Sequence, residues 1–237
     1  MGSREILGII PARGSSKSIP KKNLYPLCGR PLIEYTFEAA KGSKYLSRIV
    51  LTTDDEQIAS LGKQNGIEVP FLRPDNLAQN DTFALPVIQH AIDYLEKHEG
   101  YSPDIIVILQ PTSPLRKARH IDEAIELLLN TGADSVVSVV EVPHRYNPVS
   151  VMKIEEGRLV PFLQGEGTRI LRRQDKPKVY ARNGAAVYVV TKETVMNQNS
   201  LFGNDCRPMM MSCEESVDID SLFDLRIAEM MLKDKGK

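Results

Sequence analysis

Short apolar runs alternate with amphipathic stretches along most of the chain. Five runs have the length and composition of buried strands, and each is bounded by polar or turn-forming residues. These predicted strands cover residues 6–10, 49–51, 105–109, 135–140 and 185–190. Between them, apolar residues recur three and four positions apart, which is typical of amphipathic helices. Strands that alternate with helices predict a parallel sheet with right-handed crossovers.

The helices of this pattern also have recognisable ends. One begins near Pro31, one follows a capping box at 53–56, and a long one covers about 82–97 and closes at Gly100. Two more are predicted around 121–129 and over 221–232. We therefore predict an α/β fold with a doubly wound, mostly parallel sheet, in a single domain that spans residues 1–237.

The alternation of strands and helices breaks after residue 142. Residues 143–178 hold several basic residues, isolated prolines and glycines, and few periodic apolar positions. Such a composition indicates an excursion from the sheet, either a small subdomain or an arm that reaches a second subunit. We expect this inserted arm to serve dimerisation, substrate binding or both.

Composition and charge argue against two classes of partner, nucleic acids and membranes. The 237 residues carry 30 Lys and Arg against 31 Asp and Glu, a formal charge of −1, which argues against nucleic acid as a partner. No apolar run approaches the roughly 20 residues of a membrane span, so no membrane association is expected. The 3 cysteines have no paired spacing, and no signal peptide is visible, so we expect reduced thiols and a cytoplasmic location.

A basic loop at 11–23 follows the first predicted strand. Gly14 and Ser15 are small enough to let the backbone curl around an anion, while Arg13, Lys17 and Lys22 supply positive charge. The loop lacks the glycine spacing of a Walker A motif. An anion-binding loop and a merely solvated basic loop both fit this pattern.

A second polar segment, residues 110–116, directly follows the third predicted strand. Its two prolines fix the backbone, so Gln110 and Thr112 could act as rigid polar contacts. A strand-to-helix turn built from ordinary turn-forming residues explains the same segment. Ligands of open α/β sheets bind beyond the carboxyl ends of the strands, which favours a site here.

A carboxylate pair lies near the C-terminus, at Asp218 and Asp220. Residues two apart in extended chain share a face, and two close carboxylates are unfavourable unless a cation neutralises them. Mg²⁺ prefers such oxygen ligands together with phosphates of a substrate. Simple solvation of a turn remains the alternative, and Asp224 fits a capping box with Ser221 instead.

With these motifs in order, the chain resembles the cytidylyltransferases that activate sialic-acid-like sugars, the CMP-acylneuraminate synthetases. The likeness spans nearly the whole chain and includes the Rossmann-like nucleotidyltransferase fold. It rests on residues 10–13 with Lys17 and 20–24, on 73–74, 77–78 and 81–82, and on 110–116, 172–175, 183–184 and 216–220.

The resemblance implies a role for each motif. Catalysis would rest on Arg13, Lys17, Asp218 and Asp220, with Mg²⁺ as the cofactor on the two aspartates. The remaining implied contacts fall into two sets: Gly14, Ser15, Lys22, Asn23, Arg73 and Thr82 for the nucleotide CTP, and Gln110, Arg173 and Gln174 for the sugar acid. The resemblance also implies a homodimer in which the 143–178 arm reaches the neighbouring subunit.

Two departures from the family pattern bear on substrate choice. Ser18 stands where many members have a glycine after the loop lysine, and the 144–149 stretch lacks a lysine that assists the sugar carboxylate in some members. In family terms, residues 172–175 favour a nine-carbon (nonulosonic) acid as the acceptor, with CTP as the nucleotide. The eight-carbon acid KDO, GTP with a legionaminic-type acid, a non-catalytic nucleotide-binding role, and one metal ion or two stay open.

Overall fold

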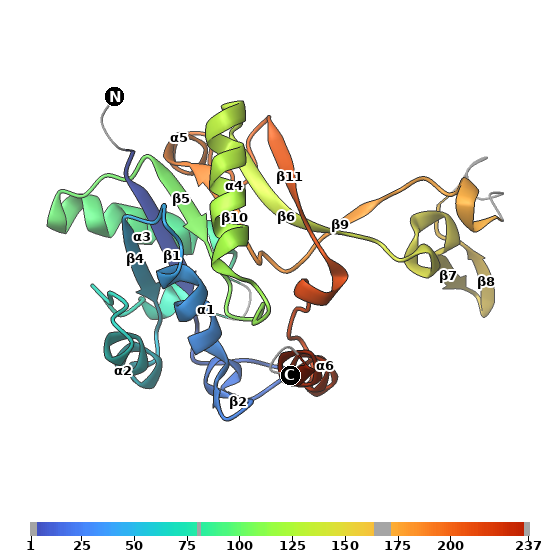
Figure 1. Cartoon of the computed structure of the whole chain (residues 1–237), viewed down its shortest axis with the longest axis horizontal. Helices are drawn as coiled ribbons and strands as arrows, with labels where there is room; N and C mark the ends of the chain where they lie inside the picture. Colours follow the sequence, from blue (N-terminus) through green and yellow to red (C-terminus); the bar gives the residue numbers. More distant parts are fainter. Residues whose placement is uncertain (1–3, 80–81, 164–171, 235–237) are drawn as a thin grey trace.

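The computed structural model describes residues 4–79, 82–163 and 172–234. Asp81, one of the residues on which the resemblance rests, and positions 164–171 of the predicted arm lie outside these ranges. Figure 1 shows a body built around one sheet and an arm that projects from it.

In the described part, the central sheet has seven strands in the order β11-β6-β10-β5-β1-β4, with β9 beside β6. Their bounds are β1 (Ile6–Pro11), β4 (Arg48–Thr52), β5 (Ile105–Ile108), β6 (Ser135–Glu141), β9 (Tyr180–Arg182), β10 (Tyr188–Thr191) and β11 (Cys206–Met211). β1 lies parallel between β4 and β5, and β6 pairs in parallel with β11. The predicted doubly wound, mostly parallel α/β fold is confirmed.

Two strands run against the others. β10 is antiparallel to both β5 and β6, and β9 is antiparallel to β6. The chain leaves the sheet at the carboxyl end of β6 and returns at the same edge through β9, so the next strand must run the opposite way. The alternation pattern did not indicate which strands of the mostly parallel sheet would be antiparallel, and β11 was not predicted.

The described residues form six α-helices, of which the first five pack against the sheet: α1 (Leu32–Lys41), α2 (Glu56–Gln64), α3 (Ala84–Glu99), α4 (Ala118–Thr131), α5 (Lys192–Met196) and α6 (Leu222–Asp234). Alternate residues of a strand face opposite sides of a sheet. Ile10 accordingly packs with α1 and α4, whereas Ile9 packs with α3. Both faces are covered, which explains why the strands read as continuous apolar runs. No helix among these is long and apolar enough to cross a membrane.

Helix α6 covers the outside of the basic loop rather than the sheet. Leu225 of α6 packs with Ile19 of the loop, with Leu27 of the small hairpin β2 (Pro26–Leu27) and β3 (Arg30–Pro31), and with Ile219. Ser221 and Asp224 exchange hydrogen bonds at the start of the helix, as the predicted capping box requires. This packing places residues 219 and 220 against the basic loop.

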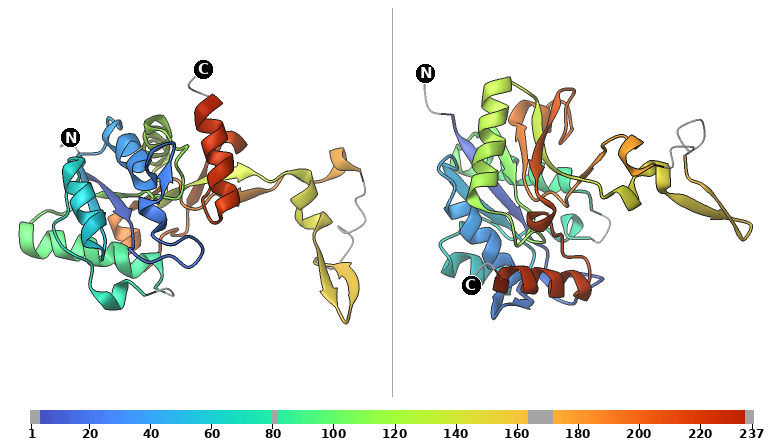
Figure 2. Two further views of the ribbon diagram at one scale, coloured as in Figure 1. Left: turned by 90° about the horizontal axis from the view of Figure 1, so that it is seen from below. Right: turned by 45° about the vertical axis from the view of Figure 1, so that its right-hand side comes forward.

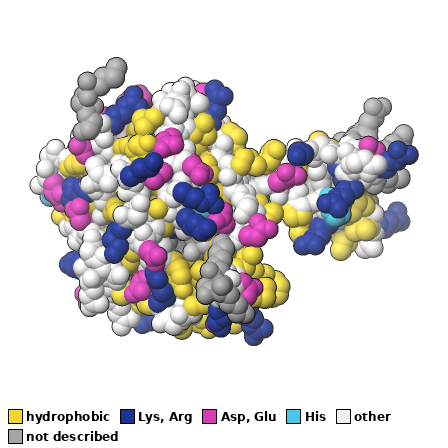
Figure 3. All heavy atoms as spheres, in the orientation of Figure 1, with side chains coloured by type: hydrophobic (Ala, Val, Ile, Leu, Met, Phe, Trp, Pro, Cys, Tyr) yellow, Lys and Arg dark blue, Asp and Glu magenta, His cyan; other side chains and the backbone are white. Residues whose placement is uncertain are grey.

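The arm is the part of the chain between β6 and β9, which Figures 1 and 2 show projecting far from the body. It contains a two-stranded hairpin, β7 (Met152–Glu155) and β8 (Arg158–Pro161). Its apolar side chains are uncovered: Ile154 is 76% exposed and Leu159 is 67% exposed. Figure 3 shows hydrophobic and basic side chains together on this projection.

Candidate active site

A cleft of about 350 Å³ opens at the edge of the sheet where the parallel strands end. β1 leads into the basic loop, β5 leads into the 110–116 segment, and β11 leads into the segment that carries Asp218. β1 lies between β4 and β5, so this is a point where the strand order reverses, the usual ligand position in such sheets. Of the predicted site residues, the cleft brings together Arg13, Ser15, Lys22, Asn23, Arg73, Thr82, Gln110, Asp218 and Asp220.

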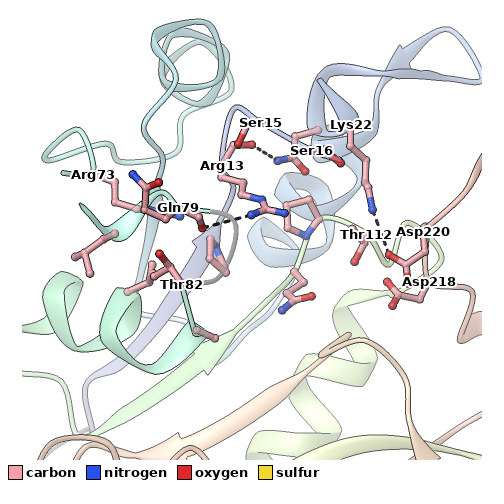
Figure 4. A pocket seen from close by; sticks show the side chains of 17 residues that line it. Arg13, Ser15, Ser16, Lys22, Arg73, Gln79, Thr82, Thr112, Asp218 and Asp220 are labelled. Atoms are coloured by element: carbon pink, nitrogen blue, oxygen red, sulfur yellow. Dashed lines mark hydrogen bonds and ion pairs between the residues drawn. The ribbon is translucent and has the colours of Figure 1, made fainter. Parts of the chain in front are cut away.

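The basic loop is held in a curled shape by its own contacts. The Asn23 amide donates to the backbone carbonyl of Arg13 at 2.8 Å, and the Gly14 amide donates to Asp54 Oδ1 at 3.0 Å. The Arg13 guanidinium reaches across the cleft to the carbonyl of Gln79 at 3.5 Å (Figure 4). Gly14 lies behind the lining. Lys17 is exposed and does not line the cleft.

Arg73 forms the wall of the cleft opposite this loop. Its guanidinium is buried and donates from Nε to Thr52 Oγ1 at 3.2 Å, and from Nη2 to the Thr52 carbonyl. The pKa of Arg73 is lowered to about 10, chiefly by burial; Asp54 opposes this shift, and the positive charge of Arg13 adds to it. The group keeps its charge at neutral pH and adds to the cationic character of this side.

The segment after β5 is braced from behind by Arg116. Its fully buried guanidinium donates to the carbonyl of Gln110 at 3.0 Å, to the carbonyl of Ala186 at 2.8 Å, and to Thr36 Oγ1. Burial lowers the pKa of Arg116 to about 9. A charge in the core is tolerated only where hydrogen bonds satisfy it, so Arg116 fixes the backbone that presents Gln110 to the cleft.

Asp218 and Asp220 point into the same end of the cleft (Figure 4). Lys22 Nζ donates to the Ile219 carbonyl at 2.6 Å and to Asp220 Oδ1 at 3.2 Å. The Asp218 carboxylate is largely buried, and its Oδ1 has no hydrogen-bond partner. Burial raises the pKa of the Asp218 carboxyl and Asp220 raises it too, whereas a hydrogen bond from Thr112 and the charge of Lys22 lower it.

These two carboxylates fit a divalent cation. An unpartnered buried oxygen beside a second carboxylate is the arrangement that a hard cation stabilises. Within the described ranges, no cluster of three or more Asp, Glu, His or Cys side chains is suited to a metal. A cation held by the pair would therefore complete its coordination with water and ligand oxygens, as Mg²⁺ does at phosphate-transfer sites.

The segment that carries the two aspartates is anchored at Glu215. Its carboxylate accepts from Lys117 at 2.9 Å and from Arg119 at 2.5 Å, and it lies 3.2 Å from Nε2 of the buried His120. Burial alone would raise the pKa of the Glu215 carboxyl, but the hydrogen bonds from Lys117 and Arg119 bring it down to about 2. His120 accepts from the Lys117 amide through Nδ1, which directs its other nitrogen toward Glu215.

Two predicted sugar-binding residues lie elsewhere. Arg173 and Gln174 are exposed on the arm and do not line the cleft. Conversely, the cleft is also lined by residues that were not predicted, among them Ser16, Gln79, Ala84 and Val87. Gln79 contributes its backbone carbonyl and Val87 belongs to the apolar stripe of α3, so neither carried a side-chain pattern that sequence could reveal.

The fold and the cleft together define a nucleotidyltransferase. Residues 7–201 match the family model described as cytidylyltransferase, and the chain belongs to this family. It is similar over its full length to a solved CMP:2-keto-3-deoxy-manno-octonic acid synthetase complexed with CTP, with a TM-score of 0.72 and 14% identity over 98% of this chain and 99% of that one. At that identity the likeness supports the fold alone.

Curated relatives are closer in sequence. The chain is 35% identical to the CMP-N,N′-diacetyllegionaminic acid synthase of Legionella pneumophila, over 96% of each chain. It is 32% identical to the post-translational flagellin modification protein B of Campylobacter coli, over 98% of this chain and 97% of that protein. It is also 29% identical to the N-acylneuraminate cytidylyltransferase of Escherichia coli, of which it spans 53%.

Proposed function

We propose that the protein transfers the cytidylyl group of CTP to a nonulosonic acid, a nine-carbon 2-keto sugar acid, and releases pyrophosphate. One observation carries the proposal: a single cleft in a cytidylyltransferase fold joins a cationic loop at one end to a carboxylate pair at the other. Phosphate groups need positive charge, and the reacting phosphorus needs precise positioning more than covalent help.

In this proposal the cationic side of the cleft holds the nucleotide. Arg13 and Lys22, with the amide of Ser15, bind the phosphates, while Lys17 closes onto the leaving pyrophosphate from the same loop. Asn23, Arg73 and Thr82 line the part of the cleft assigned to ribose and cytosine. A guanidinium binds phosphate oxygens through strong, charge-assisted hydrogen bonds, which suits Arg13 to this role.

Asp218 and Asp220 hold Mg²⁺ in this proposal, and Lys22 keeps Asp220 in place. When bound, the cation polarises phosphoryl oxygens and helps to orient the sugar hydroxyl. The anomeric hydroxyl oxygen of the sugar acid attacks the α-phosphorus in line and loses its proton to water. The bond between the α-phosphorus and the oxygen that bridges it to the β-phosphorus breaks, which releases pyrophosphate. Arg13 and Lys17 stabilise the charge that develops on the departing pyrophosphate.

The sugar side of the cleft is incomplete in one protomer, where Gln110 is its main polar residue. We propose a homodimer in which the arm of one protomer brings Arg173 and Gln174 to the cleft of its partner. A guanidinium binds a carboxylate through two parallel hydrogen bonds, which suits Arg173 to the carboxylate of the sugar acid. The exposed apolar residues of the hairpin β7–β8 give the arm a surface to bury in such a dimer.

We also propose a cytoplasmic enzyme, because Cys28, Cys206 and Cys213 are free, exposed thiols, which suit a reducing compartment. For the acceptor, the relative from Legionella pneumophila and a second one from Campylobacter jejuni, 32% identical, are both named for CMP-N,N′-diacetyllegionaminic acid. A diacetamido nonulosonic acid is therefore the first acceptor to test.

The test is a matrix of pyrophosphate release. CTP and GTP are each combined with N,N′-diacetyllegionaminic acid, N-acetylneuraminic acid, pseudaminic acid and KDO, with and without Mg²⁺. We expect Mg²⁺-dependent release with CTP and a nine-carbon acid. Release only with GTP or only with KDO would contradict the proposed substrates, and tight CTP binding without release from any pair would indicate a non-catalytic nucleotide-binding protein.

A further inference from the structure

The turn between β9 and β10 comes unusually close to the carboxylate of Asp218. Gly184 in this turn has φ +67, a left-handed conformation that favours glycine. A Cβ atom on Gly184 would overlap Cγ and Oδ2 of Asp218, and Oδ1 would be 2.6 Å away. These separations are far inside van der Waals contact. The carboxylate therefore occupies space that exists only because residue 184 has no side chain.

The residue before this glycine ties the turn to the segment that carries Asp218. Asn183 is 5% exposed, and its amide nitrogen donates to Ser216 Oγ at 3.0 Å. Its amide oxygen accepts from Ser138 Oγ of β6 at 2.6 Å. Ser138 in turn accepts from the Val187 amide at 3.0 Å. The turn is thus fixed to the sheet on one side and to Ser216, two residues before Asp218, on the other.

The other side of the carboxylate segment is held by the segment after β5. The Ile219 amide donates to the Thr112 carbonyl at 2.8 Å. Asp218 lies between these two supports with Oδ1 buried and unpartnered. An acidic oxygen in that position loses hydration without gaining a hydrogen bond, so its placement serves a ligand rather than the stability of the fold.

We propose that Asn183 and Gly184 are positioning residues for the metal-binding carboxylate of Asp218. Asn183 sets the course of the chain at Ser216, and Gly184 provides the space into which the carboxylate fits. Residues that orient a metal ligand commonly change metal affinity 10–100-fold when they are replaced. This inference rests on the proposed metal role of Asp218, and the experiment below separates the failure of either one.

The chain offers matched controls for a Gly184→Ala substitution. Gly132 has the same φ of +67 with nothing within 4 Å of an added Cβ, so Gly132→Ala introduces the backbone strain alone. Gly203 has φ +65, and its added Cβ would meet Asp134 Oδ2 at 2.7 Å. Gly203→Ala therefore combines the same strain with a clash against an aspartate outside the cleft.

The experiment measures Mn²⁺ binding to the apo-protein by electron paramagnetic resonance, without substrates and without turnover. We expect Gly184→Ala to weaken Mn²⁺ binding at least about 10-fold. The Gly132→Ala and Gly203→Ala variants are expected to bind like the wild type. Metal-free CTP binding by Gly184→Ala is expected to stay within about twofold, because Arg13, Lys22 and Arg73 are untouched.

The possible results distinguish the metal role of Asp218 from the positioning role of Asn183 and Gly184. Absence of Mn²⁺ binding to the wild type would overturn the metal role and this inference with it. Wild-type affinity in Gly184→Ala, or an equal loss in Gly203→Ala, would overturn the positioning role while leaving the metal role intact. If Gly184→Ala does not fold, Ser216→Ala removes the acceptor of Asn183 in a milder way, and unchanged Mn²⁺ affinity there would overturn the inference.

Discussion

Both the body and the arm contain strands with apolar side chains, but these side chains are buried in the body and exposed in the arm. Ile106 of β5 is completely buried between helices, whereas Ile154 of β7 is 76% exposed. In the body, helices cover both faces of the sheet. In the described part of the arm, the two-stranded hairpin leaves Ile154 and Leu159 exposed, and such hairpins are marginal alone.

The body and the arm also differ in the functional residues that they carry. The body places the cationic loop, Gln110 and the carboxylate pair of one protomer around a single cleft. The arm carries Arg173 and Gln174 on an exposed segment away from that cleft. In the dimer that we propose, the body performs the chemistry and the arm completes the cleft of the neighbouring protomer.

The largest effect is expected in the body cleft. Asp220→Ala should lower pyrophosphate release about 10³-fold, because it removes one of two carboxylates that stabilise charge in the transition state. The Asp220 side chain is 81% exposed, so the fold should be unaffected. Asp93→Ala, which removes a surface carboxylate on α3, is the matched control and should keep the full rate. Normal turnover in Asp220→Ala would refute the metal assignment.

The next largest effect is expected on the folding stability of the body. Ile106→Ala should lower the free energy of unfolding by about 2–5 kcal/mol, since it leaves a cavity between the sheet and α3. Urea unfolding measures this change. A decrease in the free energy of unfolding of less than about 1 kcal/mol would contradict the close packing of Ile106 against α3.

A third prediction tests the arm. Leu159→Asp should raise the dissociation constant of the dimer at least about 100-fold, because a charge would be buried in an apolar interface. The body should stay folded by circular dichroism. Met230→Asp replaces a comparably exposed residue of α6, 60% against 67%, and should leave the dimer intact. Sedimentation velocity over a dilution series distinguishes the two variants, and an unchanged dimer in Leu159→Asp would exclude this surface.

The smallest of these effects concerns the anchor of the carboxylate segment. The pKa of Glu215 is lowered to about 2, below its ordinary value near 4.3, so its stabilisation is present above pH 4.3 and is lost as the pH falls toward 2. Glu215→Gln should therefore lower the unfolding free energy by about 2 kcal/mol at pH 7 and by less at pH 3. A cost that does not change with pH would contradict the ionic role of Glu215.

The sequence predicted those parts of the fold that local patterns determine. Ile9 and Ile108 lie in continuous apolar runs, and such runs are typical of strands covered on both faces. β11 was not predicted because Pro208 and three methionines lack the β-branched side chains typical of strands. Its burial nevertheless alternates as in a strand, since Met209 and Met211 are buried and Met210 is exposed. The reversed direction of β10 depends on where the arm re-enters the sheet, which no local pattern encodes.

The residues of the candidate site likewise include some that a local pattern predicts and some that it does not. Residues directly after strands, such as Arg13 and Gln110, could be predicted because parallel strands end at one edge. The place of Arg173 depends on the path of a long insertion, and the role of Gly184 depends on Asp218, 34 positions further along the chain. These relations arise only from tertiary structure.

The most direct test of the division between body and arm mixes two inactive variants, Asp220→Ala and Arg173→Ala. Random exchange of subunits makes half of the dimers mixed, and each mixed dimer has one cleft with an intact carboxylate pair and an intact arm from its partner. We predict that the mixture regains about a quarter of the wild-type rate of pyrophosphate release, although each variant alone is inactive. Absence of recovery, with mixed dimers demonstrated by native mass spectrometry, would contradict the account.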